Sequence, residues 1–382
     1  MRIWVIGRTV PEGKTGMIGI FEFEQAQALQ HFGDDVQVSY LFSDNRSIKA
    51  LRTCGKDYRK KEDVSLYGSY LPVGGLPQFL FQPLKSSKLC SAMKKCEESG
   101  KPDAIHVHFP LLTMTDKIWD KLKSYGVPIF VTEHWSKVQT KKLEPFRVSL
   151  LKKIVEEAAE FVCVGYPLRD SVKELTGTSR ELPVIPNMVS PLFHPANEQK
   201  TDDIFRFITV GRLVPMKRFN IVIDAFAKAF KDHENVQLIV AGGGELADTL
   251  KNQVQNLGIE KQVTMTGAVE REKVAELMRQ ADCFVSASVL ETFGVPFIEA
   301  WSSGKPVIAV KPSAIEAYLH EANGMLVPPD DADALAHAME QMAAQYDRFS
   351  CSAIASEAEA KFSQASVAKE LLRRMSEKEK IQ

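Results

Sequence analysis

Short apolar runs alternate with amphipathic stretches of helical length along the whole chain. The apolar runs are RIWVIG, DVQVSYLF, AIHVH, PIFVTEH and FVCVGY in the first half, and FRFITVG, VQLIVAGG, VTMTG, CFVSAS and PVIAV in the second. Such runs are typical of strands buried on both faces of a parallel sheet, with the intervening helices covering those faces. The pattern therefore predicts an α/β protein built on doubly wound parallel sheets.

The alternation is interrupted by a polar segment near the middle of the chain. Residues Asn187 to Asp203, NMVSPLFHPANEQKTDD, contain proline and little periodicity, which indicates a linker. We predict a first domain at 1–187, a linker at 188–203, a second domain at 204–358, and a C-terminal helix at 359–382 that crosses back to the first domain. Ligands of such sheets bind at the carboxyl ends of the strands, so a cleft between the two domains is the expected site.

The charge balance excludes a polycation that seeks nucleic acid. Of 382 residues, 48 are Lys or Arg and 49 are Asp or Glu, and 45% are apolar, as in a soluble globular protein. The halves differ, since residues 1–187 carry 27 basic and 22 acidic residues and the remainder carries 21 and 27. Either the first half faces something anionic or this is ordinary surface variation, and both readings stay open.

Cysteine usage and hydropathy indicate a cytoplasmic protein, free or attached peripherally to the inner face of the membrane. The six cysteines form no CxxC pair, which argues against a zinc site or a disulfide framework. The N-terminal MRIWVIG is too short for a signal peptide. No apolar run approaches the ~20 residues that a spanning helix needs.

A glycine-rich loop follows the first strand. The spacing from Gly7 to Gly13-Lys14-Thr15 is one residue too long for a phosphate-binding P-loop, and a strand ending in the required Asp is hard to find, so we reject a P-loop ATPase. What remains is a loop whose Gly16 and Gly19 open onto the first helix. These glycines either let the backbone approach a ligand at a helix N-terminus or simply make a tight strand-to-helix turn.

Three histidines lie at the ends of expected strands of the first half. His106 and His108 alternate on one strand and share a face, but no third metal ligand follows at suitable spacing, so hydrogen-bonded strand-end histidines are the favoured interpretation. His134 comes just past the next strand, where an imidazole can exchange hydrogen bonds with a substrate hydroxyl.

The second half places basic and acidic residues after its strands. Arg212 and Lys217 follow Gly211, and a guanidinium and an ammonium beside a glycine turn suit a diphosphate. In ETFGVPFIEAWSSGKP, Glu291 falls on a strand-end loop, and Pro296 suits the first turn of a helix, which would hold Glu299 in that turn. For the two glutamates alone, a solvated Glu291 and a Glu299 that complements its helix dipole would be the simpler interpretation.

In combination these segments resemble a known family. The segments are GRLVPMKRFN, IVAGGGE, VTMTGAV, ADCFVSASVLETFGVPFIEAWSSGKPVIA, NGMLVPPDDADALAHAM and VIPNMVSPLFHP. Together they resemble the retaining GT-B glycosyltransferases of family 4, also called glycosyl transferases group 1. The resemblance covers most of the chain and implies a GT-B fold of two Rossmann-like domains, the first binding the acceptor and the second the nucleotide-sugar donor.

The resemblance also implies roles for individual residues. Arg212 and Lys217 would neutralise the departing nucleotide diphosphate, Glu291 would bind the hydroxyls of the donor sugar, and Glu299 those of the ribose. His134 would lie near the transferred sugar. The implied catalytic set is His134, Arg212, Lys217 and Glu291; the donor-binding set is Gly211, Arg212, Lys217, Gly267, Val269, Glu291, Phe293, Gly294, Val295 and Glu299; and the acceptor or phosphate loop contains Gly16 and Gly19.

The implied reaction moves a hexosyl or N-acetylhexosaminyl group from a nucleotide-diphosphate sugar to a sugar or lipid-linked hydroxyl acceptor, in cell-surface polysaccharide or glycolipid synthesis. The cationic side chains would take the place of a metal ion, and no cofactor beyond the donor is expected. Glu291 would orient the sugar. It would not act as the nucleophile, which is the role of the second carboxylate in a retaining glycosidase. Two departures are KPSAIEA, where Pro312-Ser313 replaces a glycine pair and Glu316 aligns loosely, and Gly165, where serine is usual.

The acceptor side of the sequence is the least informative. LPVGGLPQFLFQPLKSSK sets Phe79, Leu80 and Phe81 beside Lys85 and Lys88, with Arg59, Lys60 and Lys61 earlier, which suits an anionic membrane surface as well as a helix packed on its own domain. KVQTKKLEPFRVSLLKK is expected to present an exposed helix face. The alternatives to a transferase are a GT-B sugar-nucleotide epimerase that needs no acceptor, a phosphorylase, for which no pyridoxal-phosphate lysine is evident, and a silent sugar-binding scaffold.

Overall fold

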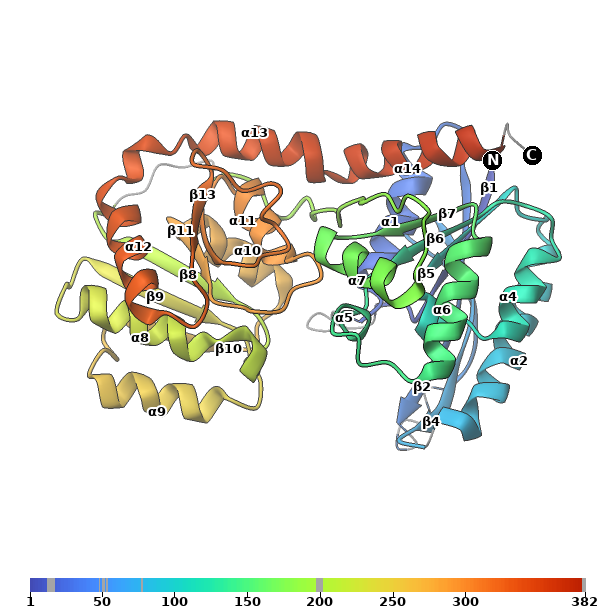
Figure 1. Ribbon diagram of the computed structural model, residues 1–382, viewed down its shortest axis with the longest axis horizontal. Helices are drawn as coiled ribbons and strands as arrows, with labels where there is room; N and C mark the ends of the chain where they lie inside the picture. The colour runs from blue at the N-terminus through green and yellow to red at the C-terminus, as the bar shows by residue number, and fades with distance from the viewer. Residues whose placement is uncertain are drawn as a thin grey trace. The chain divides into compact units, whose positions relative to one another are not determined.

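The computed structural model describes residues 1–11, 18–47, 49, 52, 54–76, 78–196 and 202–379. The described chain forms two compact units (Figure 1). One consists of residues 1–188 with the last helix, α14 (Gln364–Glu379), and the other is Val189–Ser363. Each unit contains one mainly parallel sheet packed against helices. The prediction of two parallel-sheet α/β domains is confirmed, and the chain leaves the first unit at Met188.

The first unit has a seven-stranded sheet in the order β3-β4-β2-β1-β5-β6-β7. All neighbours are parallel except the edge pair of β3 and β4. Because the chain builds outward from β1 in one direction and then continues from β5 in the other, the sheet has a switch point between β1 and β5. The strands are β1 (Arg2–Gly7), β2 (Gln37–Ser47), β3 (Gly55–Lys61), β4 (Val64–Gly74), β5 (Ala104–His108), β6 (Ile129–Glu133) and β7 (Glu160–Cys163).

Helices complete the core of this unit. Phe23 and Leu29 of the first helix pack with the strands and with Val367, Leu371 and Met375 of α14, so the last helix belongs to this core. Arg374 of α14 also pairs with Glu160 at 3.0 Å. The helices are α1 (Ile20–Phe32), α2 (Gln78–Glu97), α3 (Pro110–Thr113), α4 (Asp116–Lys123), α5 (Ser136–Gln139), α6 (Pro145–Glu157) and α7 (Tyr166–Thr176).

The second unit has a fully parallel six-stranded sheet in the order β10-β9-β8-β11-β12-β13. Its switch point lies between β8 and β11, where the loops after these two strands diverge. The strands are β8 (Phe205–Val210), β9 (Val236–Ala241), β10 (Val263–Gly267), β11 (Cys283–Ser286), β12 (Val307–Val310) and β13 (Gly324–Val327). The helices are η2 (Pro215–Lys217), α8 (Phe219–Phe230), α9 (Ala247–Leu257), α10 (Arg271–Gln280), α11 (Val295–Ser302), α12 (Ala332–Ala344), η3 (Tyr346–Arg348) and α13 (Cys351–Phe362).

The strands expected from apolar runs are all present, with ends shifted by a few residues. The expected list lacked β3, β4 and β13. The sequence of β3, GKDYRKK, is charged and largely exposed because this strand forms the edge of its sheet, where lysine is common. All six cysteines are free thiols. Among the described helices, none is both long and apolar enough to cross a bilayer.

Candidate active site

The loops after β8 and β11 bring two predicted residues into direct contact. Lys217 at the end of η2 forms an ion pair with Glu291, and the two side chains are only 22% and 16% exposed. The backbone N–H of Val289 donates to the carbonyl of Met216 at 3.2 Å, which joins the two loops. The pair lies at the switch point of the sheet, where ligands of doubly wound folds bind.

Arg212 lies on the same loop, five residues before Lys217, with its guanidinium unengaged. It follows Gly211 at the end of β8, is exposed, and forms no side-chain hydrogen bond or ion pair with any other residue that the structure describes. A guanidinium offers several fixed N–H donors and binds phosphate oxygens in pairs. The site therefore presents one paired and one free cation to an anionic ligand.

Backbone hydrogen bonds join the Arg212 loop to the glycine-containing loop after β9, and join that loop to the end of β10. The N–H of Gly211 donates to Ala241, that of Leu213 donates to Gly243, and that of Gly242 donates to Gly267, each at 2.9–3.0 Å. Gly242 has φ +147° and passes so close to this loop that a Cβ there would lie 1.8 Å from the Gly211 carbonyl oxygen. The two loops can approach this closely only because Gly242 has no side chain.

Gly242→Ala is therefore expected to destabilise the second unit by about 1–3 kcal/mol or more and to displace the Arg212 loop. Gly243→Ala is the matched control, because its Cβ would approach Ala268 no closer than 3.1 Å, compared with 1.8 Å from a backbone oxygen at Gly242. Thermal unfolding of both variants checks this. Equal melting temperatures for the two variants would contradict the account.

Glu299 lies just beyond the first turn of its helix, where the sequence suggested a position within that turn. Helix α11 begins at Val295 after Gly294, whose φ of +88° makes the turn, and Pro296 lies in the first turn as predicted. Glu299 is thus the fifth helical residue, and the expectation that it belongs to the first turn was wrong. Its carboxylate is buried and accepts from the Arg271 Nη2 at 3.3 Å, so it is held by a specific partner.

The other residues of the predicted donor set differ in how far they are buried. Gly267 ends β10 with φ +68°, and Val269 follows it half-buried. Phe293 is buried against Tyr318 and Phe362, and Val295 is also buried. The side chains of these last two residues therefore belong to the core of the unit. In the loop after β12, Glu316 is exposed and lies 3.8 Å from Lys311.

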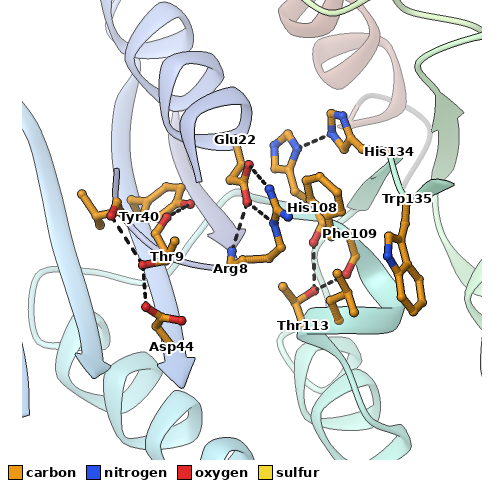
Figure 2. Close-up of polar contacts among 12 residues, drawn as sticks. Arg8, Thr9, Glu22, Tyr40, Asp44, His108, Phe109, Thr113, His134 and Trp135 are labelled. Atoms are coloured by element: carbon orange, nitrogen blue, oxygen red, sulfur yellow. Dashed lines mark hydrogen bonds and ion pairs between the residues drawn. The ribbon is translucent and has the colours of Figure 1, made fainter. Parts of the chain in front are cut away.

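In the first unit, His134 follows β6 directly and is held on several sides. Its Nε2 lies 3.0 Å from the Nδ1 of His108, and its ring is stacked on Phe109 with centroids 4.6 Å apart. The Oε1 of Glu133 accepts from the backbone N–H groups of His134 and Trp135 at 2.9 and 2.8 Å. The side chain is therefore fixed at the carboxyl end of the sheet (Figure 2).

Sequence reasoning missed an ion pair at the carboxyl ends of the strands of the first unit. Arg8, just after β1, donates through Nε to the buried Glu22 at 2.7 Å, and its guanidinium carbon lies 3.5 Å from the centre of the Phe109 ring (Figure 2). The available signal was that Arg8 follows the first strand and its glycine, as Arg212 does in the second unit. These residues occupy the switch point between β1 and β5.

The glycine loop of the first unit is only partly described. Gly16 lies outside the described residues. Gly19 precedes α1 with φ +86°, and a Cβ there would lie 2.5 Å from the Thr9 carbonyl oxygen, so this glycine makes a close turn onto the strand-end loop. That contact favours the turn-making interpretation for Gly19.

Two expected surface features of the first unit are partly internal. Lys85 is half-buried in α2, donates to the Leu112 carbonyl at 3.2 Å, and burial lowers its pKa. Arg147 of α6 is buried and donates to the Leu111 carbonyl, whereas Lys152 of the same helix is exposed, so the expected exposed helix face does not include Arg147. The side chains of Phe79 and Leu80 lie outside the described residues. Within the described residues, no group of three or more His, Cys, Asp or Glu is arranged to hold a metal ion.

Burial sets the protonation of the groups around His134. Desolvation lowers the pKa of His106 and His134 to about 3 and that of His108 well below its ordinary value. Desolvation raises the pKa of Glu133 to about 7, against the backbone N–H groups and Arg8, which lower it. At neutral pH the three imidazoles are uncharged.

These shifts predict loss of stability in acid. A buried imidazole contributes fully above pH 6.5 and loses its contribution as pH falls toward 3, by about 1.4 kcal/mol per pH unit. Glu133 acts oppositely between about 4.5 and 7, and it offsets one of the three imidazoles. We expect His106→Gln to melt at a lower temperature than wild type at pH 7. The difference between the two melting temperatures should be smaller at pH 5. The deficit of the exposed control His337→Gln should stay constant, and a constant deficit for His106→Gln would contradict the assignment.

Comparison with solved structures defines the class of fold. Sucrose-phosphate synthase from Thermosynechococcus elongatus matches with a TM-score of 0.77 at 20% identity, over 98% of each chain. The Anabaena protein HepE in complex with UDP and glucose matches with a TM-score of 0.69 at 18% identity, over 99% of this chain and 100% of that one. The protein has the GT-B fold.

The sequence comparisons then give the family. Residues 193–360 match the family model described as glycosyl transferases group 1, and residues 22–191 match that of glycosyltransferase family 4. The chain belongs to the group 1 (family 4) glycosyltransferases, which confirms the resemblance drawn from its motifs.

The matches to curated relatives cover a smaller share of those relatives' own length than the structural matches do. An uncharacterized glycosyltransferase of Methanocaldococcus jannaschii is 29% identical over 49% of this chain and 51% of its own. Alpha-monoglucosyldiacylglycerol synthase of Streptococcus pneumoniae is 39% identical over 27% of this chain and 23% of its own. The matches thus span about half or less of these relatives.

Proposed function

We propose that the protein is a metal-independent, retaining glycosyltransferase that moves a hexosyl or N-acetylhexosaminyl group from a nucleotide-diphosphate sugar to a hydroxyl acceptor. The observation that carries the proposal is the Lys217–Glu291 pair at the β8/β11 switch point, with the unengaged Arg212 on the same loop as Lys217. The family supports sugar transfer, and this pair supports the donor site within it.

The proposed chemistry follows from the charges involved. The bond between the sugar's anomeric carbon and the diphosphate oxygen breaks, leaving an oxocarbenium-like sugar and an additional negative charge on the diphosphate. Arg212 and Lys217 stabilise that charge, and such electrostatic stabilisation is usually a large part of catalysis. The acceptor oxygen bonds to the anomeric carbon on the face that the diphosphate leaves, and the acceptor proton passes to the departing phosphate oxygen.

The carboxylates orient the donor in this proposal. Glu291 is held by Lys217 and accepts from the sugar hydroxyls, while Glu299, held by Arg271, accepts from the ribose hydroxyls. The nucleobase lies against the backbone around Gly267 to Val269. His134 contacts the transferred sugar, and no cofactor other than the donor is required.

The named relatives support a sugar nucleotide and, more weakly, a lipid-linked acceptor. The Anabaena neighbour has been solved with UDP-glucose, and the pneumococcal relative is named as a glucosyldiacylglycerol synthase. We propose synthesis of a cell-surface polysaccharide or glycolipid, with peripheral attachment to the anionic inner face of the membrane through exposed cations such as Arg59 and Lys60 of β3. An epimerase without an acceptor is not favoured, because both matched family models describe glycosyltransferases.

Thermal unfolding with a panel of nucleotide diphosphates and nucleotide sugars, in EDTA and beginning with UDP, tests the donor site. A ligand of the folded state raises the melting temperature in proportion to its occupancy. A shift that one nucleotide produces in EDTA identifies the donor base and supports metal independence. A shift that appears only with added divalent metal would contradict metal independence, and no shift with any nucleotide would contradict the donor site.

A further inference from the structure

Two cations contact one short segment at the switch point of the first sheet. Residues 109–112 follow β5 directly, and Arg8 follows β1, which is the neighbour of β5. The guanidinium carbon of Arg8 lies 3.5 Å from the centre of the Phe109 ring (Figure 2). Lys85 of α2 donates from Nζ to the Leu112 carbonyl at 3.2 Å. Doubly wound sheets bind their ligands at such a point, so these two cations are candidates for a ligand of the first unit.

The two cations differ in how their charge is compensated. Arg8 donates through Nε and Nη2 to the two carboxylate oxygens of the buried Glu22, at 2.7 and 3.3 Å, while its Nη1 forms no hydrogen bond with any residue that the structure describes. Lys85 forms no ion pair within the described part of the chain, and its one hydrogen bond there goes to a neutral carbonyl. An ammonium has three N–H donors, so two donors of Lys85 remain for a ligand.

Capping of a helix end does not account for Lys85. The last carbonyls of a helix have no partner within it, and in α3 those of Leu111 and Leu112 accept from Arg147 and Lys85, at 2.8 and 3.2 Å. Arg147 also has a carboxylate partner, Glu144 at 2.9 Å. For Lys85, the carbonyl takes one donor and leaves the positive charge without a paired carboxylate.

The surroundings of Lys85 disfavour its positive charge. Burial lowers the pKa of Lys85, the charge of Asp44 raises it, and the charge of Arg8 lowers it further. Asp44 is itself engaged, because it accepts from the Thr9 hydroxyl at 2.9 Å and lies 4.0 Å from Arg46. The side chain of Arg8 is 21% exposed and Lys85 is half-buried, so both can be reached from solvent. An anion at this position would compensate the charge and occupy the remaining N–H groups.

We propose that Arg8 and Lys85 bind an acidic group of the acceptor, a phosphate or a carboxylate, at a site that lies entirely within the first unit. The binding of an anion rests on the contacts of these two residues, and its identity as part of the acceptor rests on the proposed function. The site gives the excess of basic residues in the first half of the chain an anionic ligand. The acceptor is then an acidic compound and not a neutral sugar.

Thermal unfolding of the full chain with small anions at constant ionic strength tests the site. The probes are inorganic phosphate, glycerol 3-phosphate for a lipid headgroup, glucose 6-phosphate for a phosphorylated saccharide, and glucuronate for a carboxylate, with glucose as the neutral control. We expect at least one acidic probe to raise the melting temperature and glucose to leave it unchanged. The probe with the largest effect identifies the source of the acidic group. No increase with any acidic probe would overturn the proposal.

Substitution of Lys85 shows whether the anion binds here or at the donor site. Lys85→Met keeps the apolar stem and removes the ammonium, and Lys88→Met is the matched control, because Lys88 is also half-buried on α2. We expect the dissociation constant of the anion to rise about tenfold or more in Lys85→Met, the effect of losing a charged hydrogen bond. It should stay at the wild-type value in Lys88→Met and in Arg212→Ala. An unchanged dissociation constant in Lys85→Met would overturn the proposal.

The role of Arg8 is tested separately. Arg8→Lys keeps a cation beside the buried Glu22, so the fold is preserved, but an ammonium does not reproduce the fixed donors of a guanidinium. We expect weaker anion binding in Arg8→Lys at an unchanged melting temperature of the free protein. Wild-type affinity in this variant would remove Arg8 from the site.

Turnover separates this inference from the proposed function. With the nucleotide sugar identified by thermal stabilisation, Lys85→Met should raise the KM of the acidic acceptor about tenfold and leave the KM of the donor unchanged. If the anion binds as expected but no nucleotide sugar is turned over with any acceptor, the anion site stands and the proposed function fails. If a neutral acceptor is glycosylated equally well by wild type and Lys85→Met, the proposed function stands and the acidic acceptor is excluded.

Discussion

Replacing Lys217 with alanine is expected to lower the turnover of the nucleotide sugar by about 10²–10³-fold, the usual effect of removing one preorganised contact to developing charge. The substitution removes the cation that would stabilise the departing diphosphate. It also releases Glu291, whose carboxylate is held by this ammonium in a largely buried position. Arg212→Ala should have a loss of the same order, because its unengaged guanidinium is available to the same phosphates.

The measurement is kcat at saturating donor, with the melting temperature recorded for each variant. Lys228→Ala is the matched control: Lys228 also pairs with a carboxylate, Asp333, but both side chains are well exposed and lie on α8 and α12, away from the strand-end loops. The control should retain wild-type turnover. Near-normal kcat in Lys217→Ala and Arg212→Ala would refute the assignment of these cations.

Replacing Glu299 with alanine should reduce stability and donor binding together. The Glu299 and Arg271 side chains are 6% and 12% exposed, and removing one member of a buried ion pair typically costs about 3–5 kcal/mol, because the other charge loses its compensation. Glu299→Gln keeps an acceptor toward Arg271 and should recover much of the stability. In the proposed function both variants lose affinity for the ribose, since the amide is a weaker acceptor than the carboxylate.

Denaturant unfolding and nucleotide titration of the two variants give these quantities. Glu276→Ala is the control, since Glu276 pairs with Lys273 on the exposed side of α10, and its free energy of unfolding should change by no more than about 0.5 kcal/mol. If Glu299→Ala were as stable as Glu276→Ala, the Arg271 contact would not contribute to the fold. If Glu299→Ala bound nucleotide as wild type does, the ribose role would be excluded.

Local patterns in the sequence were sufficient for the architecture and for locating the strand-end loops of the second unit. Continuous apolar runs located the buried parallel strands, because such strands have no polar face. Arg212, Lys217 and Glu291 were identified because each follows a recognisable strand, and loops at the carboxyl ends of neighbouring parallel strands converge. The direct pairing of Lys217 with Glu291 agrees with that reasoning.

The features that sequence reasoning missed depend on partners far away in the chain. Arg8 acquires its meaning from Glu22 on α1 and from Phe109 after β5, and no spacing motif links the three. Phe293 sits in a motif typical of ligand loops, yet its side chain packs into the core, because the turn at Gly294 directs it inward. The internal position of Lys85 likewise follows from its contact with Leu112, which the apolar and basic pattern of α2 does not reveal.

Acceptor-dependent release of nucleotide diphosphate, followed by ³¹P NMR in EDTA with nucleotide sugars and a panel of carbohydrate and diacylglycerol acceptors, tests the central claim most directly. We expect that one nucleotide sugar is consumed in EDTA, that its consumption depends on an acceptor, and that Lys217→Ala abolishes most of this consumption. Conversion of the nucleotide sugar to an isomer without an acceptor, or consumption only after a divalent metal is restored, would contradict a metal-independent sugar transfer at the Lys217–Glu291 site.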